Sequence, residues 1–267
     1  MKKIIVSGLF IYPVKSFAGV SIQSSDLDDM GLKYDRRWMV VTTEGKFVTQ
    51  RTMPKMALIK TALDEGGQLT LSTQGKSDHP VALVDIDSKK MDVIIWRDKL
   101  QVQKASDETD LWISDVLEID CHLVYISNDV ERQCNLEYAK QGDKTGFADA
   151  YPMLMVSEES LEDLNARLDK PVEMRRFRPN IVIKGCDAFA EDKMEAFKIA
   201  DIAMNGVKLC DRCPMPTVDP DKGERDGQEP IITLAKYRKW DGKVYFGMNV
   251  IHRELGEIKI GDELVET

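Results

Sequence analysis

Two closely spaced cysteines are the first residues in this sequence that could do chemistry. They lie in Cys210-Asp211-Arg212-Cys213, where two residues separate the thiols. Such a pair can form half of a zinc site, act as a redox dithiol, give one thiolate to a metal, or fill a core. The other possible zinc ligands are scattered: Cys121, Cys134, Cys186, His79, His122 and His252. The spacing of these residues therefore does not provide the four ligands that a structural zinc needs.

The residues around the cysteine pair favour a single metal-binding thiolate, while a purely structural role stays open. Pro214-Met215-Pro216 follows directly, and this is poor sequence for opening the helix that a thioredoxin-like dithiol needs. Arg212 precedes Cys213, and a neighbouring cation favours the thiolate. Residues 217–223 then predict a turn that either folds over a site or is an ordinary surface turn.

Basic clusters lie beside aromatic residues or prolines where strands are expected to begin or end. They are Tyr12-Pro13-Val14-Lys15-Ser16, Asp35-Arg36-Arg37-Trp38, Gln50-Arg51 and Arg175-Arg176-Phe177-Arg178-Pro179-Asn180. Each cluster alone is typical of a solvated surface. Loops at strand ends present side chains to ligands, and the planar guanidinium suits phosphate and pterin-like edges. Together the clusters predict a pocket for a compact polyanion.

The composition indicates a folded, acidic protein. The chain has 267 residues, of which 43% are hydrophobic, enough for one large or two modest domains. Its net charge of −9 argues against a general nucleic-acid or anionic-membrane binder. No run of about 18 uncharged apolar residues occurs, so no membrane span is predicted. The odd cysteine count, without framework spacing, predicts free thiols in the cytoplasm.

Several common catalytic motifs are missing from the sequence. It contains no G-x-G-x-x-G, Walker loop, H-E-x-x-H or G-x-S-x-G. Only three histidines are present, which argues against a Ser-His-Asp site. His252 is expected at the end of a strand, in a structural role.

The elements that must position the N-terminal clusters are mostly short strands. Runs of β-branched and aromatic residues alternate with turn residues, which predicts an antiparallel sheet or a small barrel. Glu44-Gly45-Lys46 predicts a hairpin turn. The expected strands are residues 4–11, 38–42, 57–63, 68–71, 81–84, 93–96 and 100–102.

Two helices and further strands are predicted in the rest of the chain. Ser106 or Asp107 would cap the first helix, and a strand over 121–126 would follow it. Ser157 would cap the second helix, which is expected to end at Lys170-Pro171. The later strands are residues 180–183, 197–200, 206–209, 243–246, 257–260 and 263–266. A domain boundary is expected near residue 120.

Taken together, these segments resemble the MOSC family, named for the C-terminal domain of molybdenum-cofactor sulfurases. The likeness is greatest to two-part members such as the bacterial N-hydroxylated-compound reductases and the mitochondrial amidoxime-reducing component. The matching residues span nearly the whole chain, in family order: 12–16, 31–32, 35–38, 48–51, 157–161, 163–165, 177–182, 210–213 and 217–220.

The resemblance implies a mostly β, α+β fold of two closely packed parts. Residues 1–120 would form a β-rich, β-barrel-like N-terminal MOSC domain, and residues 121–267 would form a MOSC β-barrel with a few helices. A molybdenum cofactor would lie between them. Cys213 would hold the metal, beside Arg212. The family's other cofactor-contacting positions fall on Lys15, Ser16, Arg36, Asp149, Ala150, Tyr151, Arg178 and Asn180.

The function implied by the resemblance is a molybdenum oxidoreductase. It would remove oxygen from a small N-hydroxylated compound such as an amidoxime, hydroxylamine or N-oxide. Asp211 and Asp219 are candidate proton donors. Electrons would come from an external ferredoxin- or flavodoxin-type protein. The family also carries a general label of pyridoxal phosphate binding.

Two alternatives and two departures from the family pattern remain. In one alternative, Cys213 carries a persulfide in a sulfur transferase; in the other, the chain carries the cofactor without turnover. Pro214-Met215-Pro216 replaces the apolar residues and threonine usual in relatives. The fused iron–sulfur domain of some bacterial relatives is not expected, because no cysteines are left for it.

Overall fold

Strands dominate both lobes of the molecule, which a computed structural model describes over residues 3–84 and 88–267. In the first half the strands are β1 (Ile4–Ile11), β2 (Val20–Ile22), β3 (Ser24–Asp28), β4 (Gly31–Leu32), β5 (Trp38–Thr42), β6 (Lys60–Leu63), β7 (Leu69–Ser72), β8 (His79–Pro80), β9 (Lys90–Ile95), β10 (Asp98–Lys104) and β11 (Cys121–Tyr125). The later strands are β12 (Met153–Ser157), β13 (Ile181–Lys184), β14 (Ala196–Ile199), β15 (Ile202–Asp211), β16 (Val218–Asp219), β17 (Glu224–Arg225), β18 (Lys239–Trp240), β19 (Lys243–His252), β20 (Glu257–Lys259) and β21 (Glu263–Glu266).

Helices are few and short within the described residues. The α-helices are α1 (Asp107–Leu117), α2 (Glu158–Asn165) and α3 (Ile231–Tyr237). The described residues also contain four short 3₁₀ turns: η1 (Pro54–Leu58), η2 (Met174–Arg176), η3 (Ala190–Lys193) and η4 (Met215–Thr217). The predicted mostly β, α+β class is confirmed.

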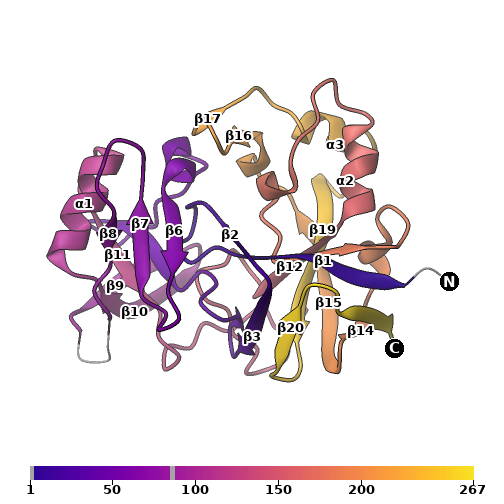
Figure 1. The fold of residues 1–267 in the computed structure, drawn as a ribbon, viewed down its shortest axis with the longest axis horizontal. Coiled ribbons are helices and arrows are strands. Elements are labelled where there is room, and N and C mark those ends of the chain that lie inside the picture. Colours follow the sequence, from indigo (N-terminus) through magenta and orange to yellow (C-terminus); the bar gives the residue numbers. More distant parts are fainter. Residues whose placement is uncertain (1–2, 85–87) are drawn as a thin grey trace.

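The larger lobe is a closed barrel of seven strands (Figure 1). Its strands follow the order β12-β13-β1-β21-β14-β15-β19, and β19 closes the ring by pairing with β12. Only the β12–β13 pair is parallel among these neighbours in the described chain. Side chains such as Leu9, Met155, Ile183, Phe197 and Val250 fill one buried core. Burial of this apolar surface is the main force that holds the barrel closed.

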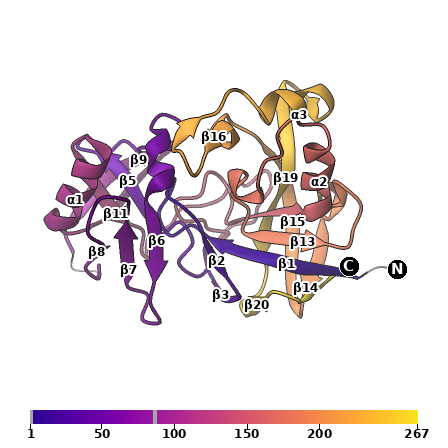
Figure 2. The same cartoon turned by 45° about the horizontal axis from the view of Figure 1, so that its top comes forward.

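The first strand lies in this barrel, although the sheets of the smaller lobe come before the other barrel strands in the sequence. β1 pairs with β13 on one side and with β21 on the other. The chain next forms β2, which pairs with β1, and β3, which pairs with β20, before it builds the smaller lobe (Figure 2). It returns to the barrel at β12. The loop after β1 therefore lies where the two lobes meet. The domain boundary near residue 120 stays a prediction.

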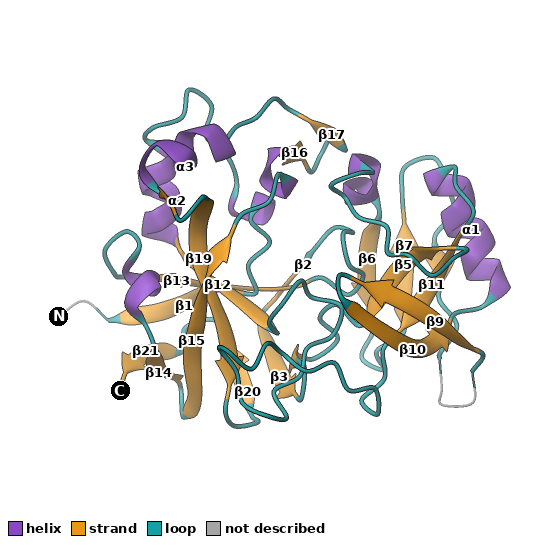
Figure 3. Cartoon of the chain, turned by 180° about the vertical axis from the view of Figure 1, so that it is seen from behind, coloured by secondary structure: helices purple, strands orange, loops and turns teal. Residues whose placement is uncertain are grey.

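The smaller lobe contains two antiparallel sheets rather than one closed barrel in the residues described (Figure 3). One sheet has the order β5-β11-β10-β9, and the other has the order β6-β7-β8. Ile113 and Leu117 of α1 are buried with Leu71 and Leu123 in the core of this lobe. The predicted hairpin turn follows β5: Gly45 has a φ of +76° and donates its N–H to Thr42 O at 2.9 Å.

Both predicted helix caps are confirmed. Ser106 Oγ accepts from Thr109 N at 3.2 Å, and Ser157 Oγ accepts from Ser160 N at 3.1 Å. Each bond satisfies a backbone N–H that has no partner within its own helix. The second helix ends at Asn165, not at residues 170–171. The Asn165 side chain donates to Val172 O at 3.0 Å and accepts from Val172 N at 2.8 Å, and these bonds hold the irregular segment that follows the helix.

Some predicted strand limits were wrong. Residues 57–63 begin in the 3₁₀ turn η1, which Pro54 opens, and only Lys60–Leu63 form a strand. Residues 81–84 are not a strand: Val81 still donates to Leu69 O at 2.8 Å, but the chain then leaves the sheet. β12 and α3 were not predicted. Within residues 3–84 and 88–267, no helix is long and apolar enough to cross a membrane.

Candidate functional site

A cavity of about 160 Å³ at the junction of the lobes brings together side chains from six separate segments of the chain. We call it the thiol cavity, because Cys210 and Cys213 line it. All the positions predicted to hold a cofactor also line it: Lys15, Ser16, Arg36, Asp149, Ala150, Tyr151, Arg178, Asn180, Arg212 and Cys213.

Lys15 is a buried cation in the wall of the thiol cavity. It is 5% exposed, and its Nζ donates to Phe147 O at 2.7 Å and to Asp149 Oδ1 at 2.5 Å. Burial lowers the pKa of Lys15 to about 8, although the carboxylate of Asp149 opposes this shift. An anion in the cavity would favour the charged form of Lys15.

Arg36 lies in the loop after β4, and its side chain is bonded to residues that precede β13 of the barrel. Its Nη1 donates to Asp35 Oδ2 at 2.5 Å and to Asn180 Oδ1 at 3.0 Å, and its Nη2 donates to Arg178 O at 3.1 Å. Asn180 in turn donates to Phe10 O and accepts from Leu154 N. This bonding fixes the direction of the Arg36 guanidinium before any ligand binds.

Tyr12 lies beneath two guanidinium groups. Its ring centre lies 4.5 Å from Cζ of Arg36 and 4.1 Å from Cζ of Arg178. Its hydroxyl donates to Pro179 O at 3.1 Å. Cations stack favourably on an aromatic face, so this ring stabilises the two neighbouring guanidinium groups, and the carboxylate of Asp35, bonded to Arg36, also offsets their repulsion. Burial, together with the charge of Arg36, lowers the pKa of Arg178 to about 10.

Three buried polar atoms of the thiol cavity lack hydrogen-bond partners in the part of the chain that the structure describes. They are Ser16 Oγ, Arg178 Nη2 and Arg212 Nε. Buried polar groups normally have partners, so an unpaired group needs an explanation such as an absent ligand. The φ angles of Ser16, Arg36 and Arg178 are +72°, +49° and +56°. Non-glycine residues in this region are uncommon, and such strain gathers at functional sites.

The two thiols differ in their surroundings. Arg212 Nη1 donates to Cys210 Sγ at 3.1 Å, and Arg212 Nη2 donates to Phe177 O at 2.9 Å. Burial raises the pKa of Cys210, although Arg212 opposes this. The cation predicted to act on Cys213 therefore contacts the other thiol directly. Cys213 is a free, partly exposed thiol in the wall of the same cavity.

Only one of the two candidate proton donors lies at this cavity. Asp211 lines it and is 3.6 Å from Lys243 Nζ. Asp219 is not among the described residues that line it. Its side chain accepts from the N–H groups of Asp221 and Lys222 and pairs with Arg176 at 3.4 Å.

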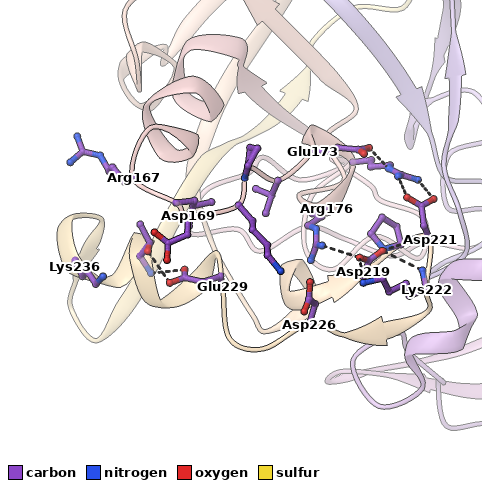
Figure 4. Close-up of a pocket in the computed structure, with 17 residues that line it drawn as sticks. Arg167, Asp169, Glu173, Arg176, Asp219, Asp221, Lys222, Asp226, Glu229 and Lys236 are labelled. Carbon is purple, nitrogen blue, oxygen red and sulfur yellow. Dashed lines mark hydrogen bonds and ion pairs between the residues drawn. The ribbon is translucent and has the colours of Figure 1, made fainter.

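A larger groove of about 630 Å³ lies beside η2 and contains Asp219 (Figure 4). Charges of both signs line it, and many are paired, including Arg175 with Glu173 and Asp221. No cysteine is among the described residues of the groove. The thiols and the unpaired buried atoms thus mark the smaller cavity as the candidate site.

The sequence reasoning missed several residues of the thiol cavity, among them Lys208 and Asn249. Lys208 lies two residues before Cys210 on β15, so period-two alternation along a strand could have found it. Asn249 is the register partner of Lys208 on β19 and donates to Lys208 O at 3.0 Å. That pairing joins segments 41 residues apart, and local sequence does not report it.

The donor set suits a cofactor held by one thiolate and a phosphate. In the described residues no group of three or more His, Cys, Asp or Glu side chains is placed to hold a metal ion. Cys213 offers one soft ligand, and soft thiolates suit metals that also bind sulfur. The unpaired donors of Arg178 and Arg212, with Lys15, match the need of a phosphate for fixed cations and hydrogen bonds. These residues therefore fit a molybdenum cofactor.

Comparison with known proteins identifies the family. Residues 3–120 match the MOSC N-terminal beta barrel domain, and residues 142–265 match the MOSC domain. Mitochondrial amidoxime-reducing component 1 of Mus musculus is 34% identical over 96% of this chain and 80% of its own length. Its Homo sapiens counterpart is 35% identical, with 96% and 81% covered. The molybdenum cofactor sulfurase of Oryza sativa is 31% identical over 94% of this chain, but over only 33% of its own length. The chain therefore belongs to the MOSC family, as a two-part member with an N-terminal MOSC domain.

Proposed function

We propose that this chain is a molybdenum-cofactor-dependent reductase that removes oxygen from small N-hydroxylated compounds. One observation carries the proposal: a single cavity joins the free thiol of Cys213 to the unpaired buried atoms of Ser16, Arg178 and Arg212. The relatives named amidoxime-reducing component support the reaction class.

The basic end of the thiol cavity would bind the cofactor's phosphate. Lys15 and Arg178 would supply charge, and Ser16 Oγ would supply a further hydrogen bond. Arg36 is already aimed by Asn180 and Asp35, so binding would cost little side-chain entropy there. Asp149, Ala150 and Tyr151 form the wall beside Lys15.

The other end of the cavity would hold the metal and admit the substrate. Cys213 would be the protein thiolate on molybdenum. Arg212, bonded to Cys210, would keep the second thiol away from the metal. When bound, the cofactor would supply the two-electron chemistry that removes oxygen from the substrate. Asp211, which lines the cavity, would deliver a proton, whereas Asp219 would have to act from the neighbouring groove.

Electrons would have to come from another protein. The sequence has no G-x-G-x-x-G for a flavin or nicotinamide cofactor, and its remaining cysteines match no iron–sulfur spacing. A ferredoxin- or flavodoxin-type donor would dock transiently and depend on complementary charge.

Metal analysis, pterin fluorescence and an amidoxime-reduction assay on the same preparation test the proposal. The chain should be purified from a host that makes the cofactor. Equal amounts of molybdenum and pterin, with turnover under a chemical reductant, are the expected result. Molybdenum and pterin without turnover would favour a cofactor carrier. A persulfide on Cys213 without metal would favour a sulfur transferase.

A further inference from the structure

The β9–β10 hairpin of the smaller lobe reaches the wall of the thiol cavity with its turn. Ile95 pairs with Asp98, so Trp96 and Arg97 form a two-residue turn. In Figure 3 the strand ends that this turn joins face the larger lobe. No residue of the turn is among the described residues that line the cavity, so the turn acts on the cavity through other side chains.

Two contacts join this hairpin to residues 146–149, which form part of the cavity wall. Trp96 Nε1 donates to Asp149 Oδ1 at 3.3 Å. Asp98 Oδ2 accepts from Arg132 Nε at 2.7 Å, and Arg132 Nη1 donates to two carbonyl oxygens of the segment at 2.6 Å. Arg132 is 5% exposed, so its bonds fix the backbone of the segment, whereas Trp96 holds the side chain of Asp149.

The conformation of Trp96 is unusual for a bulky residue. Its φ angle is +56°, a value that large side chains rarely adopt. The residue is 45% exposed, so burial in a core does not account for this strain. Its ring lies 5.1 Å from the ring of Phe47, between centroids, and 4.3 Å from Cζ of Arg51. Backbone strain of this kind gathers at functional sites, and here the indole N–H is aimed at Asp149.

The position of the Asp149 carboxylate depends on this contact. The Asp149 side chain is 51% exposed, whereas the side chain of its partner Lys15 is 7% exposed. A half-exposed carboxylate can rotate into water, but its Oδ1 accepts from both Lys15 Nζ and Trp96 Nε1. The indole N–H therefore favours the rotamer that keeps the carboxylate on Lys15. Although desolvation opposes the shift, the charges of Lys15 and Arg51 hold the pKa of the Asp149 carboxyl well below its usual range.

The charge of Lys15 depends in turn on that carboxylate. Burial lowers the pKa of Lys15, and Asp149 opposes this shift. Arg132 and Arg36, from two other segments, lower the pKa further because like charges repel. With the carboxylate turned away, Lys15 would lose its proton at a lower pH and would attract an anion in the cavity less strongly.

We propose that Trp96 is a positioning residue of the thiol cavity: its indole N–H holds the Asp149 carboxylate on Lys15, and so keeps the ammonium group charged for an anionic ligand. The smaller lobe thereby acts on the cavity through a residue that does not line it. The inference rests on the proposed function in one respect, because the cofactor's phosphate would be that anion. The cofactor-free chain tests the inference, so the inference and the reductase activity can fail separately.

The titration midpoint of Lys15, read by NMR from isotope-labelled lysine side chains of the full cofactor-free chain, tests the inference. The signal of Lys15 is the one that Lys15→Arg lacks. Trp96→Phe keeps an aromatic ring on Arg51 and removes the N–H, and it should lower the midpoint by roughly 0.5 to 1 pH unit. Asp149→Asn removes the charge itself and should lower the midpoint by roughly 1 unit or more. Trp112→Phe is the matched control, because Trp112 Nε1 donates to Ser77 O at 3.1 Å and Trp112 is not among the described residues of the cavity.

Calorimetric titration with inorganic pyrophosphate at pH 8 links this midpoint to anion binding. If the charged form of Lys15 binds the anion, Trp96→Phe should bind it about two- to fivefold more weakly than the unchanged chain. Trp112→Phe should bind it equally well. A midpoint in Trp96→Phe equal to that of the unchanged chain overturns the inference, as does an equal shift in Trp112→Phe. Absence of pyrophosphate binding by the unchanged chain, or equal binding by Trp96→Phe, also overturns it.

Discussion

Arg36 Nη1 donates to Asn180 Oδ1 at 3.0 Å, across 144 residues of sequence. This bond ties the loop after β4 to the residue that precedes β13 in the barrel. The same guanidinium binds Asp35, whose side chain is 1% exposed. One side chain thus links the two lobes and shapes the basic end of the thiol cavity.

Replacing Arg36 should destabilise the fold as well as the site. Arg36→Met leaves the buried carboxylate of Asp35 without its cation, which typically costs about 3–5 kcal/mol in the free energy of unfolding. Urea denaturation measures this loss. Arg175→Met is the control: Arg175 is 40% exposed in its pairs with Glu173 and Asp221, and exposed pairs contribute about 0–1 kcal/mol. Similar losses in both variants would contradict the structural role of Arg36.

Retention of the cofactor should fall as the pH rises above about 8. Burial lowers the pKa of Lys15 to about 8, so the side chain loses its charge, and its attraction for phosphate, as the pH passes this value. The folded chain binds fewer protons than the unfolded chain between pH 8 and the ordinary lysine range, so Lys15 itself makes the protein more stable as the pH rises there.

A fall in cofactor retention together with a rise in folding stability, both with rising pH, would thus identify Lys15 as the group that titrates. Pterin retained after desalting at pH 7 to about 9.5 gives the first trend, and thermal unfolding of the cofactor-free chain gives the second. Lys15→Arg should keep pterin at the higher pH, because arginine stays charged. Retention that falls equally in both proteins would show that another group controls release.

The isolated chain should reduce an amidoxime with reduced viologen but not with NADH or NADPH alone. Each oxygen removal consumes two electrons, and no nucleotide-binding motif is present to accept them from a nicotinamide. Adding a ferredoxin- or flavodoxin-type reductase system should restore turnover. Rapid turnover with NADH alone would reveal a second redox site.

Local patterns in the sequence were sufficient to predict many elements. Ser106 and Ser157 cap helices as expected, because a cap bond depends on residues three positions apart. The predicted end of the second helix was wrong, and the irregular segment that follows it is held by bonds between the Asn165 side chain and Val172, seven residues away. Segments held by such contacts are not visible in periodicity.

The candidate site was predictable through family resemblance and not through spacing. The ten cofactor positions named from the resemblance all line the thiol cavity. Spacing alone left the cysteine pair open between four roles. It also placed the Arg212 cation with Cys213, whereas the guanidinium contacts Cys210.

The central claim, that Cys213 holds molybdenum, is tested most directly by the molybdenum bound per chain in two cysteine variants. Each should be purified from a host that makes the cofactor. Cys213→Ser should lose the metal, because an alcohol is a harder and weaker ligand than a thiolate at this site. Cys210→Ala should keep most of its molybdenum, since that thiol is bonded to Arg212. Molybdenum kept by Cys213→Ser and lost by Cys210→Ala would contradict the assignment.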